Sequence, residues 1–178
     1  TLTQAPSSTV AAGTSTDFIV QFDASVPGPY STTVTIDNDD ADENPYTFTV
    51  NATAGAPEAV LFVGPASGTA LANGGSFDYG SVTVSQSSTQ TFTIVNNGTA
   101  TLNITGFSTG GDTGDFGLLS TPATTLAPGA SSSFDAAFAP TSTGGKTFTV
   151  SVDNTDAGET PYDVTLTGTG APRQLAIT

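Results

Sequence analysis

Five acidic side chains crowd one short stretch of the sequence, DNDDADENPY at residues 37–46. Carboxylate oxygens on one loop are the ligands that Ca²⁺ prefers, and Ca²⁺ takes about six to eight of them. The stretch is not an EF-hand loop, which needs glycine where Asp42 stands and glutamate where Phe48 stands. It is therefore a candidate calcium site, and calcium is the one cofactor that the sequence suggests. The candidate ligands are Asp37, Asp39, Asp40, Asp42 and Glu43.

A second stretch, DNTDAGETPY at residues 153–162, repeats this pattern with fewer carboxylates. It keeps Asp153, Asp156 and Glu159, while Thr155 and Gly158 replace two of the acidic residues. A metal site that the fold required would not lose ligands between two copies. The alternative is a turn in which Asp and Asn side chains cap their own backbone. Both interpretations remain open at the level of the sequence.

Side chains suited to catalysis are scarce. The chain has no His and no Cys, and its only Lys is Lys146, so it lacks a base that titrates near neutral pH and a thiol nucleophile. A carboxylate pair could support glycoside hydrolysis, but such sites use aromatic sugar platforms, and the chain has no Trp. We therefore expect that the protein is not an enzyme.

The charge of the chain excludes several partners. Sixteen acidic residues face one Lys and one Arg, and the net charge is −14. Such a surface repels nucleic acid and anionic lipid.

No apolar run of about 18 residues occurs, so we expect no direct membrane insertion within this segment. The N-x-T sequons at Asn51, Asn97 and Asn103 are candidate glycosylation sites, compatible with a secreted or cell-surface protein.

Apolar residues alternate with Thr and Ser in runs such as TFTVSVDN and TFTIVNN. A period of two places one face of each strand in a core and the other in water. Seven or eight such runs in residues 57–171, separated by Gly, Pro, Asn and Asp, predict an all-β fold of the immunoglobulin-like sandwich type. A β-barrel is the alternative architecture.

The chain also repeats itself, because a shift of 116 positions places residues 37–38 on 153–154 and residues 45–46 on 161–162. Residues 1–56 match only the second half of the unit that residues 57–171 contain whole. We expect tandem immunoglobulin-like sandwiches, in which residues 1–56 are the C-terminal half of a domain completed by another segment or chain. Residues 171–177, APRQLAI, resemble 56–62, APEAVLF, so 172–178 are expected to be the first strand of a following domain or a donor strand.

The order of blocks in the complete unit carries a family resemblance. It runs FDYGSVTVSQSSTQTFTIVNNGTATLNITG, GDFGLL, TTLAPGASSSFDAAFAP and GGKTFTVSVDNTDAGETPY. This order resembles the Ig-like repeats of bacterial choice-of-anchor D surface proteins and, more distantly, hydin-type and major-sperm-protein-like domains. The resemblance implies a secreted or surface-attached, non-catalytic structural module. It transfers no functional residue, because the matched positions are turns and core.

The function expected from these features is an extracellular structural repeat in a stalk, adhesin or filament. Its partners would be copies of itself or neighbouring repeats, arranged head-to-tail, with a strand like 172–178 pairing into a half-domain like 1–56. The alternative is a module that binds a carbohydrate or a protein through tyrosines at one end of the sandwich. Those candidate contacts are Tyr30, Tyr46, Tyr79 and Tyr162.

Overall fold

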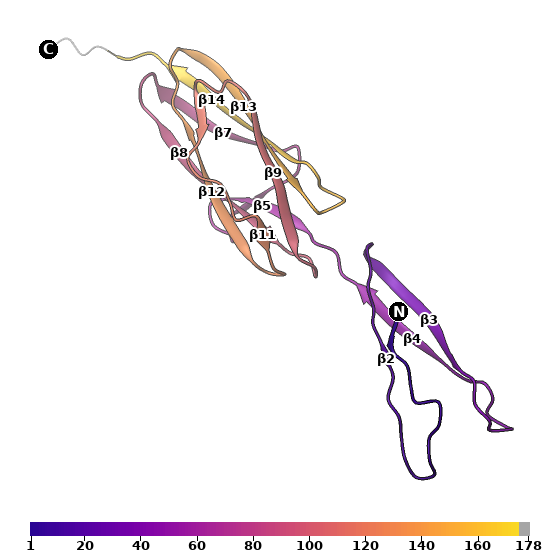
Figure 1. Cartoon of the computed structure of the whole chain (residues 1–178). Helices are drawn as coiled ribbons and strands as arrows, with labels where there is room; N and C mark the ends of the chain where they lie inside the picture. The colour runs from indigo at the N-terminus through magenta and orange to yellow at the C-terminus, as the bar shows by residue number, and fades with distance from the viewer. Residues whose placement is uncertain (175–178) are drawn as a thin grey trace. The chain divides into compact units, whose positions relative to one another are not determined.

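The computed structural model describes residues 1–174 and divides the chain into two compact units, Thr1–Gly55 and Ala56–Thr178. Every regular element in the described residues is a β-strand, which confirms the predicted all-β fold (Figure 1). In the described part of the chain, no helix has the length and apolar character needed to cross a bilayer. The strand expected at residues 172–178 falls mostly on residues 175–178, outside the described part.

The second unit is a sandwich of two five-stranded sheets. One sheet has the order β10-β12-β8-β5-β6 and the other β11-β9-β13-β14-β7, and all neighbours are antiparallel except the parallel pair β14 and β7. The strands are β5 (Ala59–Val63), β6 (Thr69–Leu71), β7 (Ser76–Thr83), β8 (Ser88–Asn96), β9 (Leu102–Gly111), β10 (Phe116–Leu118), β11 (Thr125–Leu126), β12 (Ser131–Phe138), β13 (Gly144–Asn154) and β14 (Tyr162–Ala171).

The core lies between these sheets and is rich in phenylalanine. Along β13, Phe148 and Val150 are buried while the Thr and Ser residues beside them are more exposed, as the period of two requires. The ring of Phe116 on β10 lies 4.5 Å from that of Phe138 and 5.3 Å from that of Phe148, so it connects the two sheets. Burying one such side chain contributes about 1.5–3 kcal/mol.

A buried asparagine fixes the start of β5 against the turn between β8 and β9. The Asn96 amide nitrogen donates to the carbonyl oxygens of Ala100 and Leu126, at 2.8 and 2.9 Å. Its amide oxygen accepts the backbone N–H groups of Glu58 and Gly98, at 3.3 and 3.0 Å. Since all of its hydrogen-bonding capacity is used, this side chain can be buried without penalty, and it holds Glu58 in place.

The first unit contains two separate two-stranded sheets. Strand β1 (Leu2–Gln4) pairs with β2 (Ile19–Val20), and β3 (Gly28–Ile36) pairs with β4 (Tyr46–Ala54). No residue of Thr1–Gly55 is buried. Residues 15–22, which are equivalent to β12, form a strand only at Ile19–Val20, because the strands that flank β12 in the second unit are not present beside them.

The internal repeat is visible in the strand register. In the first unit Gly28 faces Ala54 and Ile36 faces Tyr46. In the second unit the residues 116 positions later face each other in the same way, Gly144 with Gly170 and Val152 with Tyr162. The β3–β4 hairpin is therefore the counterpart of the β13–β14 hairpin, residue by residue.

Candidate functional site

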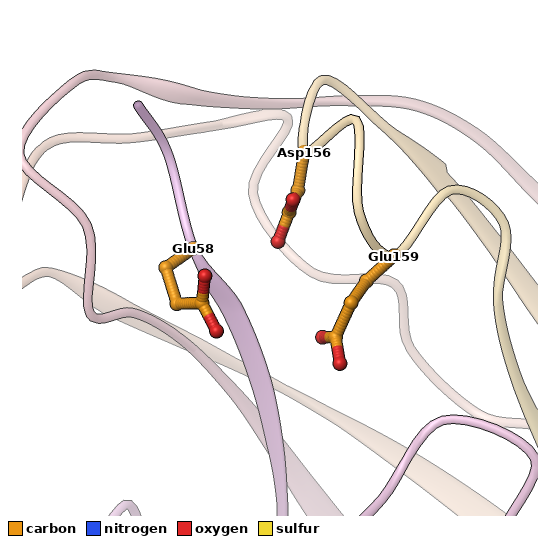
Figure 2. Close-up of side chains that lie close together, drawn as sticks. All are labelled: Glu58, Asp156 and Glu159. Carbon is orange, nitrogen blue, oxygen red and sulfur yellow. The ribbon is translucent and has the colours of Figure 1, made fainter. Parts of the chain in front are cut away.

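Three carboxylates from two distant segments meet at one end of the second unit (Figure 2). Asp156 and Glu159 lie on the loop between β13 and β14, and Glu58 directly precedes β5. One ligand oxygen from each lies within 4.8 Å of the others. Asp156 is buried, Glu159 is half-buried and Glu58 is exposed. We call these residues the three-carboxylate cluster.

The loop that carries two of them is shaped by Asn154. Its side-chain nitrogen donates to the carbonyl oxygens of Val152 and Glu159, both at 3.1 Å, and its side-chain oxygen accepts the N–H of Asp156 at 2.7 Å. Asp156 continues this pattern, because its Oδ1 accepts the N–H of Gly158 at 2.9 Å. Asp and Asn side chains commonly build such turns by bonding the backbone two residues on.

Asp156 also reaches across the sandwich. Its Oδ2 accepts the backbone N–H of Ala59 at 2.9 Å, which ties the β13–β14 loop to the beginning of β5. Both carboxylate oxygens of this buried side chain thus accept backbone hydrogen bonds. Hydrogen bonds to a charged acceptor contribute about 1.5–3 kcal/mol each, so this side chain acts as a structural clasp.

Glu159 is the member of the cluster whose charged form is disfavoured by its surroundings. Its burial, together with the negative charges of Asp156 and Glu58, raises the pKa of the Glu159 carboxyl above its usual value. Burial disfavours the charged form of a carboxyl, and like charges nearby act in the same direction. A proton or a cation would relieve this repulsion. Because Ca²⁺ takes six to eight oxygens and Asp156 already uses both of its own, the cluster offers few ligands to such an ion.

The sequence-predicted calcium ligands lie on the equivalent loop of the first unit, between β3 and β4, and all five are exposed: Asp37, Asp39, Asp40, Asp42 and Glu43. Within residues 1–174, no three of them bring ligand oxygens within 4.8 Å of one another. Hydrogen bonding with Asp42 lowers the pKa of Asp40. Calcium binding at this loop stays a prediction.

The loop of the first unit has the same asparagine frame as that of the second. The side-chain nitrogen of Asn38 donates to the carbonyl oxygen of Glu43 at 3.0 Å, and its side-chain oxygen accepts the N–H of Asp40 at 2.8 Å. Asp40 Oδ1 accepts the N–H of Asp42 at 3.3 Å. This geometry supports the turn interpretation for the acidic stretch, since the same bonds form in both copies.

Glu58 is the member of the cluster that sequence reasoning missed. It stands 98 positions before Asp156, and no spacing rule links them. The one signal was the APEA stretch at the start of the complete unit, which marks where β5 begins but says nothing of what it approaches.

An ion pair joins the loop between β9 and β10 to β13. Lys146 Nζ on β13 lies 3.0 Å from Asp115 Oδ2 on that loop. Asp115 Oδ1 also accepts the N–H and the hydroxyl of Thr141, at 2.6 and 2.8 Å. The Thr141 backbone bond, followed by the bond from Lys146, lowers the pKa of Asp115. The lone lysine of the chain is therefore held in an ion pair.

The candidate glycosylation residues are all exposed, with Asn51 on β4, Asn97 directly after β8 and Asn103 on β9. Modification of these residues stays a prediction.

The tyrosine hypothesis is wrong for two of its four residues. Tyr162 is buried and donates its hydroxyl hydrogen to Leu71, and Tyr79 is half-buried with its hydroxyl 2.7 Å from the carbonyl oxygen of Ala136. Tyr162 closes the core at the first residue of β14, and Tyr79 packs against the core from the middle of β7. Tyr30 and Tyr46 of the first unit are exposed and remain available for contact.

Several solved structures are similar to this chain. A protein of unknown function from Porphyromonas gingivalis W83 has 13% sequence identity, with 82% of this chain and 67% of that chain covered and a TM-score of 0.49. A PapD-like domain of human CEP192 has 13% identity, covering 56% and 82%, with a TM-score of 0.41. The Vibrio cholerae VesB protease has 21% identity, and the chain covers 30% of its length, with 53% of this chain aligned and a TM-score of 0.43.

At the level of sequence, no curated protein shows a significant match. The sequence model of the family described as HYDIN/CFA65/VesB-like, Ig-like domain matches residues 73–170, which is more than half of the chain. The matched range covers most of the sandwich, from before β7 to all but the last residue of β14. The chain therefore belongs to the family of HYDIN/CFA65/VesB-like Ig-like domains.

Proposed function

We propose that this protein is a load-bearing structural repeat of a surface protein outside the cell, of the choice-of-anchor D kind. The observation that carries the proposal is the position of the first and last strands of the second unit. Strand β5 lies between β8 and β6, and β14 lies between β13 and β7, so each is hydrogen-bonded on both sides. Force applied at the two ends of this unit must break ladders on both sides of a central strand.

The interior of the second unit supports a spacer better than a receptor for a small molecule. A void of about 10 Å³ between the sheets is lined by side chains that include Leu61, Ile94 and Tyr162. It has the size of a single water and a mostly apolar lining. Ligand pockets have volumes of about 300–1,000 Å³.

The surface supports a position outside the cell. A net charge of −14 favours solubility, and the candidate glycosylation asparagines are all exposed. Partners would be neighbouring repeats or further copies in a head-to-tail series. The protein would transmit force and set distance, and would perform no catalysis.

The second candidate function is a binding module for a carbohydrate or a protein. It is favoured by the exposed rings of Tyr30 and Tyr46, because tyrosines contribute strongly to binding surfaces. Both lie on the first unit, so binding by this route would depend on residues 1–55.

Single-molecule force spectroscopy tests the spacer proposal. Stretched between its termini, the full chain should show one cooperative unfolding step from the second unit, with a length gain on the order of 400 Å at roughly 3.5 Å per residue. Gradual extension without a force peak would overturn the proposal. A glycan array with the intact chain separates the second candidate, because saturable binding that Tyr30→Ala and Tyr46→Ala abolish would favour the binding module.

A further inference from the structure

The first unit exposes the side chains that its counterpart buries. Tyr46 is 53% exposed whereas Tyr162, its equivalent, is 5% exposed, and Phe22 is 45% exposed whereas Phe138 is fully buried. Two grooves of about 200 and 690 Å³ open on this unit, lined by residues that include Phe22 and Tyr30 in one and Phe18 and Ile36 in the other. A hydrophobic surface of this kind on a soluble protein marks an interaction site. We call the surface formed by residues 15–22, β3 and β4 the open face.

The second unit shows which strands cover the equivalent surface. There β12 lies between β10 and β8, β13 pairs with β9, and β14 pairs in parallel with β7. The open face supplies the counterparts of β12, β13 and β14. Within residues 1–174, β3 and β4 pair only with each other, so each leaves one edge unpaired. The missing neighbours are strands equivalent to β7, β8, β9 and β10, which all come from residues 57–118.

A polar group on the open face also has a defined missing partner. In the second unit Asp156 Oδ2 accepts the N–H of Ala59 at the beginning of β5. The equivalent residue is Asp40, and among the described residues its side-chain bonding involves only Asp42, on the same loop. An incoming segment that begins like β5 would present a backbone N–H to this carboxylate.

Charge decides which segment fits. The residue before Ala59 is Glu58, which faces two carboxylates and contributes to the raised pKa of Glu159. Opposite the open face, the same position would meet the five acidic residues of the β3–β4 loop. The sequence repeats this entry at Ala171-Pro172, and there Arg173 stands in place of Glu58. Arginine would be attracted to the acidic loop, whereas glutamate would be repelled.

We propose that the open face docks a polypeptide segment that is the first half of a repeat, with the strand pattern of residues 57–118 and with arginine at the position of Glu58. The docked segment completes a sandwich like the second unit. This inference rests on the proposed repeat function and adds to it the partner and the residue that selects it.

A single strand does not meet this requirement. In the second unit β5 is hydrogen-bonded to β8 and β6, and to neither β12, β13 nor β14. A segment equivalent to β5 that keeps the pairing seen in the second unit would therefore leave the free edges of β3 and β4 unpaired. Four further strands, equivalent to β7, β8, β9 and β10, are needed to pair with the free edges of the open face. The docked segment is therefore the whole first half of a repeat.

The experiment titrates two polypeptide probes against the full 178-residue chain. Both span residues 57–118, one with the natural sequence and one with Glu58→Arg. Hydrogen exchange should show added protection at β3 and β4 when either probe is bound. At low salt the arginine probe should bind about tenfold or more tightly than the natural one, and the ratio should approach one near 1 M salt, where the Debye length is about 3 Å.

Receptor variants locate the site. Phe22→Asp, on the open face, should reduce binding at least about tenfold. The matched control Val26→Asp adds the same charge at a residue that is 61% exposed in the loop before β3, and it should bind like the natural chain.

Three results would overturn the proposal. They are no added protection at β3 and β4 with either probe, protection confined to the second unit, and equal affinity of the two probes at low salt. The force peak of the second unit does not depend on probe binding. A negative result of the probe titration therefore does not affect the force-spectroscopy test of the spacer. A negative result of force spectroscopy likewise does not affect the probe titration.

Discussion

Asp156 Oδ2 accepts the backbone N–H of Ala59 at 2.9 Å, across 97 positions of sequence. The bond joins the β13–β14 loop of one sheet to the first strand of the other. In a tandem repeat this places a structural clasp at the end where the unit begins, beside the negative charges of Glu58 and Glu159. The hydrogen bonds that stabilise the second unit and the negative charges of the three-carboxylate cluster therefore lie at the same end of the sandwich.

Asp156→Ala should destabilise the second unit. The substitution leaves the N–H groups of Ala59 and Gly158 without their acceptor, and we expect a loss of about 2–3 kcal/mol, or roughly 10 °C in Tm. Relief of repulsion within the three-carboxylate cluster opposes this by less than about 1 kcal/mol. Calorimetry on the full chain measures the change. Asp153→Ala, an exposed residue of the same hairpin, is the control and should change Tm little; equal Tm values for the two variants would refute the clasp.

Glu159→Gln should stabilise the protein at pH 7. Because the folded state raises the pKa of Glu159, the contribution of this group is fully present below its unfolded pKa of about 4.3 and is lost as the pH rises through the folded value. The neutral glutamine avoids that loss, so Tm should rise by about 1–3 °C at pH 7 and the gain should vanish near pH 4. Glu43→Gln, which makes the same charge change outside the three-carboxylate cluster, is the matched control. A gain that persists unchanged at pH 4 would contradict the electrostatic cause.

Much of this architecture could be predicted from the sequence. The alternation of Phe148, Val150 and Val152 with Thr and Ser identifies β13, because one face of that strand lies in the core and the other in water. The alternation in TFTIVNN identifies β8 in the same way. The short strands β6 and β11 were not predicted, since two or three residues carry no periodicity and their pairing depends on the neighbouring strand.

The three-carboxylate cluster could be predicted only in part. The turn chemistry around Asn154 and Asp156 is local, and the residue types indicate it. The approach of Glu58 is a tertiary contact that exists because β5 begins beside the β13–β14 loop. The exposure of Tyr46 agrees with its place among the candidate contacts, whereas Tyr162, at the equivalent position, is buried because the other half of the sandwich is present.

Removal of divalent cations tests the calcium hypothesis for residues 37–43. A ligand that binds only the folded state stabilises it by RT ln(1 + [L]/Kd), so a structural calcium would make Tm fall in excess chelator. The exposed and dispersed carboxylates of this loop lead us to expect a Tm unchanged within about 1 °C. The comparison is made at fixed ionic strength, because screening alone changes the stability of a chain with net charge −14. A clear fall in Tm, restored by added Ca²⁺, would establish the site.

Truncation of the equivalent tyrosines of the two units should change stability by very different amounts. Tyr162→Ala empties a buried position and removes the hydroxyl that bonds Leu71, so the second unit should lose about 3–5 kcal/mol. Tyr46→Ala removes a ring that is 53% exposed, and the cooperative transition of the chain should change by less than about 0.5 kcal/mol. Urea denaturation followed by circular dichroism measures both.

The same pair then reports on the open face when the arginine probe of residues 57–118 is present. If docking completes a sandwich around the first unit, Tyr46 occupies the place there that Tyr162 holds in the second unit. Tyr46→Ala should then weaken probe binding at least about tenfold, because a buried aromatic anchor contributes about 2 kcal/mol or more at an interface. Thr47→Ala, at the exposed neighbouring position on β4, is the matched control and should bind normally. Equal binding by both variants would mean that the probe does not cover Tyr46 in the manner of the complete unit.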